Sequence, residues 1–191
     1  MIGARILTAG LIFSLCLGFR DFFESNPVSH VLIQLPLLAW CGALLAQPAI
    51  NLEAEWNRGG VVALLIALFG ITFWMLPRSI DAALFSPAME VAKFISLPLC
   101  VGAPLAIGWA RAHPLLRGFL KAQAVSMLGV MAFLYTHAPV RICNAYLVDD
   151  QLRLGYAFLF TAIAVVVLWV APLFVGSREF HQMRSRSVEA G

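Results

Sequence analysis

The sequence predicts an all-α protein, a polytopic bundle of about six transmembrane helices that forms a single membrane domain over residues 1–191. Hydrophobic residues make up 61% of the chain and charged residues 12%, and the mean hydropathy of +0.87 lies well above that of soluble domains. The apolar residues form separate runs of about 16–22, close to the ~20 residues that a helix needs to cross a bilayer. Because a bilayer interior has no water to satisfy strand edges, we expect these runs to be helices.

We expect the spans at residues 6–19, 28–46, 59–76, 87–109, 115–135 and 154–175. The first is the shortest, and its positive start at Arg5 before an apolar stretch is also typical of a cleaved signal peptide. No small-x-small cleavage site follows it, so we interpret it as a retained span. Prolines inside the second and fourth spans predict bends, at Pro36, Pro98 and Pro104.

Basic residues predict the orientation, because short loops rich in Lys and Arg tend to stay in the cytoplasm. With six spans, both termini face the side that carries more basic residues, so we expect both to be cytoplasmic. A nucleic-acid partner would need a basic, soluble surface, whereas here the net charge of +3 follows from the loop bias, so membrane lipid is the expected surrounding. The cytoplasmic set is Arg5, Arg58, Arg111, Arg117, Lys121, Arg178, Arg184 and Arg186, and the opposite set is Arg20, Arg78, Lys93, Arg141 and Arg153.

Polar residues inside the spans are informative because a charge in hydrocarbon is costly and is usually paired or functional. Glu90 and Lys93 are three residues apart near the start of the fourth span, so they share a helix face and can neutralise one another. We expect an ion pair, and the alternative is proton or ion handling. Gln34, one turn after His30 in the second span, is placed to bridge helices by hydrogen bonding.

The common enzyme signatures are missing from the sequence, so we expect a protein that is not an enzyme and has no catalytic residue. No GxGxxG, Walker loop, GxSxG, HExxH or CxxC pattern occurs. Only His30 among the histidines lies within a predicted span, which argues against a haem held by two membrane histidines.

A pattern of residues joins the end of the third predicted span to the start of the fourth: Trp74-Met75-Leu76-Pro77, then Asp81-Ala82-Ala83-Leu84, then Ser86-Pro87-Ala88. It resembles the CtaG family of cytochrome c oxidase assembly factors, in which a helix ends in a W-H-x-P-like element, an outer loop carries D-A-A-L and the next helix opens after N-P-A. Residues 31–35, with Gln34, are similar to the H-M-x-Q-H helix of that family, and residues 147–152 resemble the start of its final helix. These segments extend over about two-thirds of the chain.

The resemblance implies a partner rather than a reaction. The family delivers copper to the oxidase through histidines, but the corresponding positions here are Val31, Leu35, Met75, Glu90 and Phe94, none of which offers an imidazole. We therefore expect a non-catalytic, CtaG-like membrane subunit or assembly factor of a copper-containing, cytochrome oxidase-type respiratory complex. The resemblance places it in the inner (cytoplasmic) membrane of a bacterial cell, among the other membrane subunits of that complex and with no cofactor of its own.

Two alternatives remain open at this stage, besides a scaffold that contacts no metal. A copper-handling protein would use thioether, thiolate and imidazole groups, which suit Cu(I), near the outer surface. The candidate ligands are His30, Met75, Met89, His137 and Cys143. They show no chelating spacing, and methionines at helix ends are common packing residues. A small ion or solute transporter or channel would instead use Glu90, Lys93 and Gln34.

Overall fold

The computed structural model describes residues 2–46, 55–138 and 146–189, with side chains described up to residue 171. Within these ranges every regular element is a helix, so the predicted all-α fold is confirmed. The elements labelled η are short segments wound as π or 3-10 helix. In chain order the elements are α1 (Ile2–Gly18), α2 (Arg20–Glu24), α3 (Pro27–Ser29), η1 (His30–Gln34), α4 (Leu35–Ala46), η3 (Glu55–Gly60), α5 (Val61–Met75), α6 (Pro77–Phe85), α7 (Pro87–Ser96), η4 (Leu97–Gly102), α8 (Ala103–Arg111), α9 (Pro114–His137) and α10 (Val148–Glu189).

Five continuous helical stretches are long and apolar enough to cross a membrane, and they match the last five predicted spans in order. The first predicted span corresponds to α1, a shorter apolar helix of 17 residues, or about 25 Å. The chain is therefore a helical membrane protein. The five stretches are Pro27–Ala46, Glu55–Met75, Pro87–Arg111, Pro114–His137 and Val148–Ala171.

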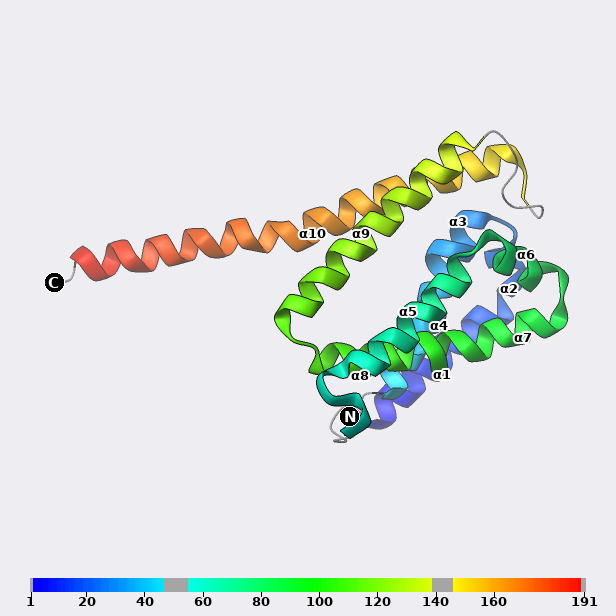
Figure 1. Ribbon diagram of the computed structural model, residues 1–191, viewed down its shortest axis with the longest axis horizontal. Helices are drawn as coiled ribbons and strands as arrows, with labels where there is room; N and C mark the ends of the chain where they lie inside the picture. Colours follow the sequence, from blue (N-terminus) through cyan, green and yellow to red (C-terminus); the bar gives the residue numbers. More distant parts are fainter. Residues whose placement is uncertain (1, 47–54, 139–145, 190–191) are drawn as a thin grey trace.

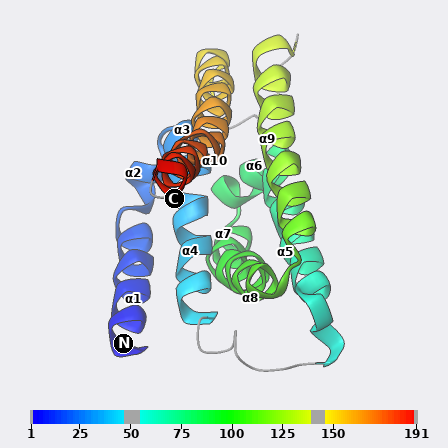
Figure 2. The same cartoon turned by 90° about the vertical axis from the view of Figure 1, so that its left-hand side faces the viewer.

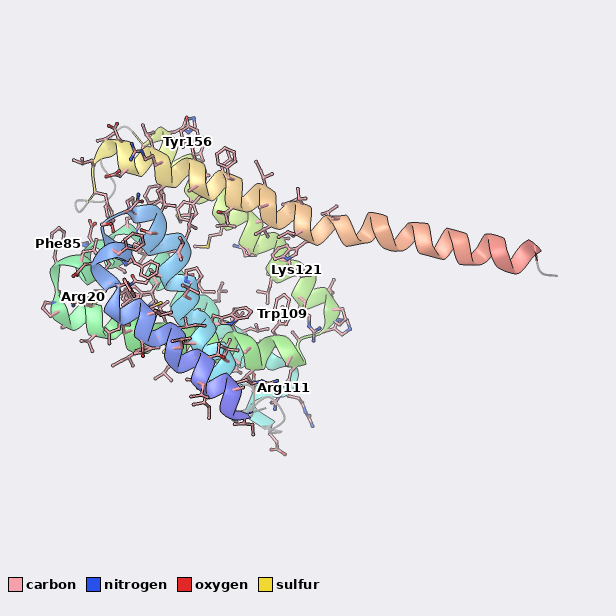
Figure 3. All side chains as sticks on the ribbon, turned by 180° about the vertical axis from the view of Figure 1, so that it is seen from behind. Arg20, Phe85, Trp109, Arg111, Lys121 and Tyr156 are labelled. Carbon is pink, nitrogen blue, oxygen red and sulfur yellow. The ribbon has the colours of Figure 1, made fainter. Side chains whose placement is uncertain are left out.

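The helices run back and forth between two ends of the bundle (Figures 1 and 2). At one end, here the Arg20 end, α2 and α6 lie near the last turn of α9 and the first turn of α10. The opposite end, here the Arg111 end, holds the start of α1, the end of α4, η3 and the corner between α8 and α9. Figure 3 shows Arg20 and Phe85 on one side of the molecule and Trp109 and Arg111 on the other.

Two of the spans contain a π segment that ends two residues before a proline. In η1 the Leu35 N–H donates to the His30 carbonyl, five residues back, and Pro36 follows; η4 has the same arrangement before Pro104. A proline ring crowds the carbonyl four residues back and offers no N–H to it, so a wider turn just before the ring relieves the crowding. At two of the prolines for which the sequence predicts bends, Pro36 and Pro104, the structure thus has a π segment.

The second and fourth spans pack with their backbones in direct contact. A Cβ added at Gly42 would lie 1.9 Å from the Pro98 carbonyl oxygen, and one added at Gly102 would lie 1.8 Å from the Ala39 carbonyl oxygen. No side-chain carbon tolerates such distances, so glycine is required at both points. Close approach of this kind maximises van der Waals contact, which drives helix association where lipid removes the hydrophobic effect.

Prolines also define the turn from α5 through α6 to α7. Leu76 and Ser86 are extended, with φ/ψ of −68°/126° and −124°/118°, and each is followed by a proline that starts the next helix. A proline disfavours helical backbone in the residue before it and is well suited to the first helical position. The Leu76-Pro77 and Ser86-Pro87 steps therefore set the boundaries of α6.

The last two spans form a hairpin. α9 and α10 pack along one another, with Gly155 of α10 against Thr136 of α9 and the rings of Tyr135 and Phe158 5.8 Å apart. At 42 residues α10 is about 63 Å long, and Figure 1 shows its far end extending beyond the bundle. On α9, only Ala132 and Tyr135 are buried.

Candidate functional site

The most unusual side chain inside the bundle is Lys93, whose accessible surface is 0% exposed. Its Nζ donates to a carboxylate oxygen of Glu24, to Gln34 Oε1 at 3.3 Å and to His30 Nε2 at 3.4 Å. A lysine ammonium carries three N–H donors, and three acceptors surround it. The charge is therefore both neutralised by a carboxylate and fully hydrogen-bonded, the conditions under which a buried cation is tolerated.

Three separate elements bring these four residues together. Lys93 lies in α7, Glu24 is the last residue of α2, and His30 and Gln34 are the first and last residues of the π segment η1. The His30 and Gln34 side chains both reach the same ammonium. The widened turn before Pro36 is thus the part of the second span that carries both neutral partners of the lysine.

Tyr146 defines the protonation pattern of His30. The Tyr146 hydroxyl donates to the Glu24 carbonyl oxygen at 3.0 Å and lies 3.1 Å from His30 Nδ1. Because the hydroxyl hydrogen is used on Glu24, the Tyr146 oxygen accepts from Nδ1–H, which leaves the Nε2 lone pair to accept from Lys93. His30 is therefore neutral, with its proton on Nδ1.

Gln34 extends the network to the first helix, since its Nε2 donates to the Cys16 carbonyl oxygen at 3.3 Å. Gln34 is 0% exposed, as is His30. The prediction that Gln34 bridges helices by hydrogen bonding is confirmed. The network joins α1, α2, η1, α7 and the segment before α10, so it can hold the Arg20 end of the bundle together, and its described groups leave no donor of Lys93 for a ligand.

Removing the Tyr146 hydroxyl tests this arrangement. Tyr146→Phe is expected to lower the free energy of unfolding by about 1–2 kcal/mol, because the buried His30 N–H and the Glu24 carbonyl both lose a hydrogen-bond partner. Denaturant titration in detergent, followed by circular dichroism, measures the change. Tyr156→Phe is the matched control, since Tyr156 is 55% exposed; an equal effect in both variants would contradict the assignment.

The predicted ion pair between Glu90 and Lys93 needs correction. Lys93 pairs with Glu24, whereas Glu90 binds Arg20 at 2.7 Å between Oε1 and Nη1. Three residues along a helix amount to about 4.5 Å and a 60° rotation, so Glu90 reaches the surface while Lys93 turns into the bundle. The charge of Glu90 and its hydrogen bond raise the pKa of the Arg20 guanidinium.

The four described candidates for a copper site have different surroundings. His30 is engaged by Lys93 and Tyr146, and His137 is exposed and stacks on Phe133 with 4.5 Å between ring centres. Met75 and Met89 pack beside two different buried apolar clusters. The cluster beside Met75 contains Val31, Ile80, Ala132, Tyr135, Tyr146, Leu154 and Phe158. The cluster beside Met89 contains Cys16, Leu35, Leu38, Trp74, Ala83, Phe94, Leu97 and Val101.

Cys143, the fifth candidate, lies outside the described residues. In the part of the chain that the structure describes, no group of three or more His, Cys, Asp or Glu side chains is placed to hold a metal ion.

The residues shared with the CtaG pattern take structural positions in the turn between α5 and α7. Trp74 is 2% exposed, and its indole Nε1 donates to Ser96 Oγ at 2.9 Å, which ties the end of α5 to α7. Pro77 starts α6, and Asp81 is buried within it.

Two members of the lysine network, Glu24 and Tyr146, were not found from the sequence. The position of Glu24 could have suggested it as a partner of Lys93, since it is an acidic residue shortly before the second span, on the same predicted side as Lys93. Tyr146 lies in the connection before α10, and no spacing or periodicity relates it to His30.

The helices and the buried network define a polytopic helical membrane protein. No protein-family model matches this chain, and no curated protein and no solved structure matches it either.

Proposed function

We propose that this chain is a non-catalytic, CtaG-like membrane subunit or assembly factor that associates with a copper-containing, cytochrome oxidase-type respiratory complex. In this proposal it resides in the inner membrane of a bacterial cell with both termini in the cytoplasm. The observation that carries the proposal is the α5–α6–α7 turn, because the residues that resemble the family are the ones that build it.

The turn supports the proposal because its family-like residues act together. Trp74 closes the turn through Ser96, and Pro77 and Pro87 start the two helices that follow. Between them α6 buries Ile80, Asp81 and Ala83. A shared pattern that forms one compact unit is stronger support than the same residues scattered over the fold.

The side chains at the family's histidine positions support a role through contact rather than through metal ligation. Val31, Leu35 and Phe94 are 1%, 3% and 6% exposed and belong to the apolar core clusters. Where relatives of the CtaG type would place imidazoles, this chain packs hydrocarbon. Association with partner subunits would then use the outer faces of the helices, such as α9, on which Phe119 and Phe133 are 64% and 65% exposed.

Purification of the tagged full-length chain from its host membrane in a mild detergent tests the proposal. We expect oxidase subunits to co-purify, and we expect deletion of the chain to lower the amount of assembled oxidase measured by its haem spectrum. An unchanged oxidase level in the deletion strain, with no respiratory subunit in the purified sample, would contradict the proposal.

The copper alternative makes a separate prediction. Met75→Leu nearly conserves volume and removes one thioether, so we expect partner association and oxidase activity to stay unchanged, within about twofold. Copper per chain is measured by elemental analysis after anaerobic loading with Cu(I), with Met127→Leu, in the middle of α9, as the control. Stoichiometric Cu(I) that is lost in Met75→Leu but kept in Met127→Leu would favour a copper-handling protein instead.

A transporter is the second candidate function, and the buried hydrogen-bonded series from Lys93 through His30 to Tyr146 favours it. Such a series is the kind of arrangement that carries protons in membrane proteins. Ion flux in liposomes that contain this chain alone would support the transporter. Its absence, together with co-purifying oxidase, would support the leading proposal.

A further inference from the structure

Two buried nitrogen donors in the described part of the chain have no hydrogen-bond acceptor, and both lie beside the end of α8. They are Asn57 Nδ2 and Arg117 Nε. Asn57 belongs to η3, which packs on α8 with Gly60 against Gly108, and Arg117 Nη2 donates to the Ala110 carbonyl oxygen at 3.1 Å. An unpaired buried donor is costly, so each of these two nitrogens would be stabilised by an acceptor.

The corner also carries positive charge that no described carboxylate neutralises. Arg117 and Lys121 lie four residues apart on α9, so they share a face and repel each other. Neither takes part in an ion pair, as the described ion pairs involve Arg20, Lys93 and Arg153. An anion bound between the two side chains would replace this repulsion with attraction.

The position of the charges corresponds to the headgroup level of a membrane. Arg117 and Lys121 lie about 4.5 and 10 Å along α9 from its start at Pro114, a depth from which long side chains reach back to the interface. The Lys121 Nζ lies 5.3 Å from the centre of the Trp169 indole ring, and tryptophan is enriched at this level. Figure 3 shows Lys121 and Arg111 on the same side of the molecule.

From these observations we propose that the corner between α8 and α9 binds the headgroup phosphate of an anionic phospholipid. The Arg117 guanidinium and the Lys121 ammonium donate to phosphate oxygens, and the acyl chains lie along exposed apolar residues such as Leu115 and Phe119. A zwitterionic lipid carries an additional positive group, so the two cations select a headgroup with net negative charge. This site lies at the opposite end of the bundle from the lysine network and is independent of the proposed function.

The test is a titration of the purified full-length protein with phosphatidylglycerol and with phosphatidylcholine of the same acyl chains, followed by native mass spectrometry. We expect tighter binding of phosphatidylglycerol. Arg117→Gln and Lys121→Gln should each weaken that binding about fivefold, and the double variant more than tenfold, since each basic residue near a membrane surface favours an anionic lipid by about that factor. Arg117→Lys keeps the charge and should retain most of the affinity.

Arg78→Gln is the matched control, because Arg78 is an exposed arginine at the Arg20 end, and it should bind phosphatidylglycerol as the wild type does. The proposal is wrong if the double variant keeps wild-type affinity, if Arg78→Gln loses as much, or if both lipids bind equally. Displacement of phosphatidylglycerol by millimolar inorganic phosphate would also overturn it, since the site would then take a free anion. If Arg117→Gln fails to fold by circular dichroism, Lys121→Gln alone decides the outcome.

Discussion

Replacing Glu24 by Gln is expected to lower the free energy of unfolding by about 3–5 kcal/mol, because it leaves the Lys93 ammonium buried without a counter-charge. Lys93 is 0% exposed, and its remaining partners, His30 and Gln34, are neutral. Denaturant titration of the purified protein in detergent, followed by circular dichroism, measures the loss. Gel filtration should also show a lower folded yield of Glu24→Gln.

Two further variants separate the ion pair from other causes. The double variant Glu24→Gln with Lys93→Met should recover much of the lost stability, since replacing a whole buried pair by uncharged groups is often nearly neutral. Glu90→Gln should have little effect, because its partner Arg20 is half exposed at the surface. If Glu90→Gln destabilises the protein as much as Glu24→Gln does, Lys93 has been assigned to the wrong carboxylate.

Gly102→Ala is expected to destabilise the bundle by at least about 3 kcal/mol, at or beyond the upper end of ordinary overpacking effects. The new Cβ would lie 1.8 Å from the Ala39 carbonyl oxygen, and a backbone atom cannot move aside as a flexible side chain can. The second and fourth spans would have to separate along their contact. The same denaturant titration measures this effect, and the melting temperature should fall with it.

Gly10→Ala is the matched control for this substitution. Gly10 also lies in an apolar helix, but a Cβ there meets nothing within 4 Å. Alanine is favoured over glycine inside a helix by about 0.5–1 kcal/mol, so this variant should be neutral or slightly stabilised. Equal tolerance of alanine at Gly102 and Gly10 would show that α4 and η4 do not touch through their backbones.

Much of the fold could be predicted because each rule involved acts within one segment of the chain. Apolar runs of span length predicted the order and type of the last five spans. The helix α6 was not predicted, since the segment with Asp81 was expected to be a loop. The prediction of a bend at Pro36 located an unusual turn, but its form as a π segment depends on how the freed carbonyl groups are accommodated.

The sequence identified Lys93 and Gln34 as polar residues of the candidate site, but it did not identify the carboxylate that pairs with Lys93. Sequence spacing favours a partner three or four residues away, and Glu90 fulfils that condition. In the folded protein α2 places Glu24 beside the lysine, although 69 residues separate them. Local spacing shows which pairs can meet along one helix, whereas pairs between helices depend on how the bundle packs.

The sequence by itself determined that the chain is a helical membrane protein, where along the chain its long apolar helices lie, and that Lys93 and Gln34 require polar partners inside the bundle. Only the tertiary structure decided which partners they have: Glu24 and His30 for the lysine, and the Cys16 carbonyl for the glutamine. The physical reason is that apolar burial is proportional to area and carries no direction, so many helix arrangements satisfy the hydrophobic pattern. Hydrogen bonds and glycine contacts are directional and short, and they select one arrangement among these.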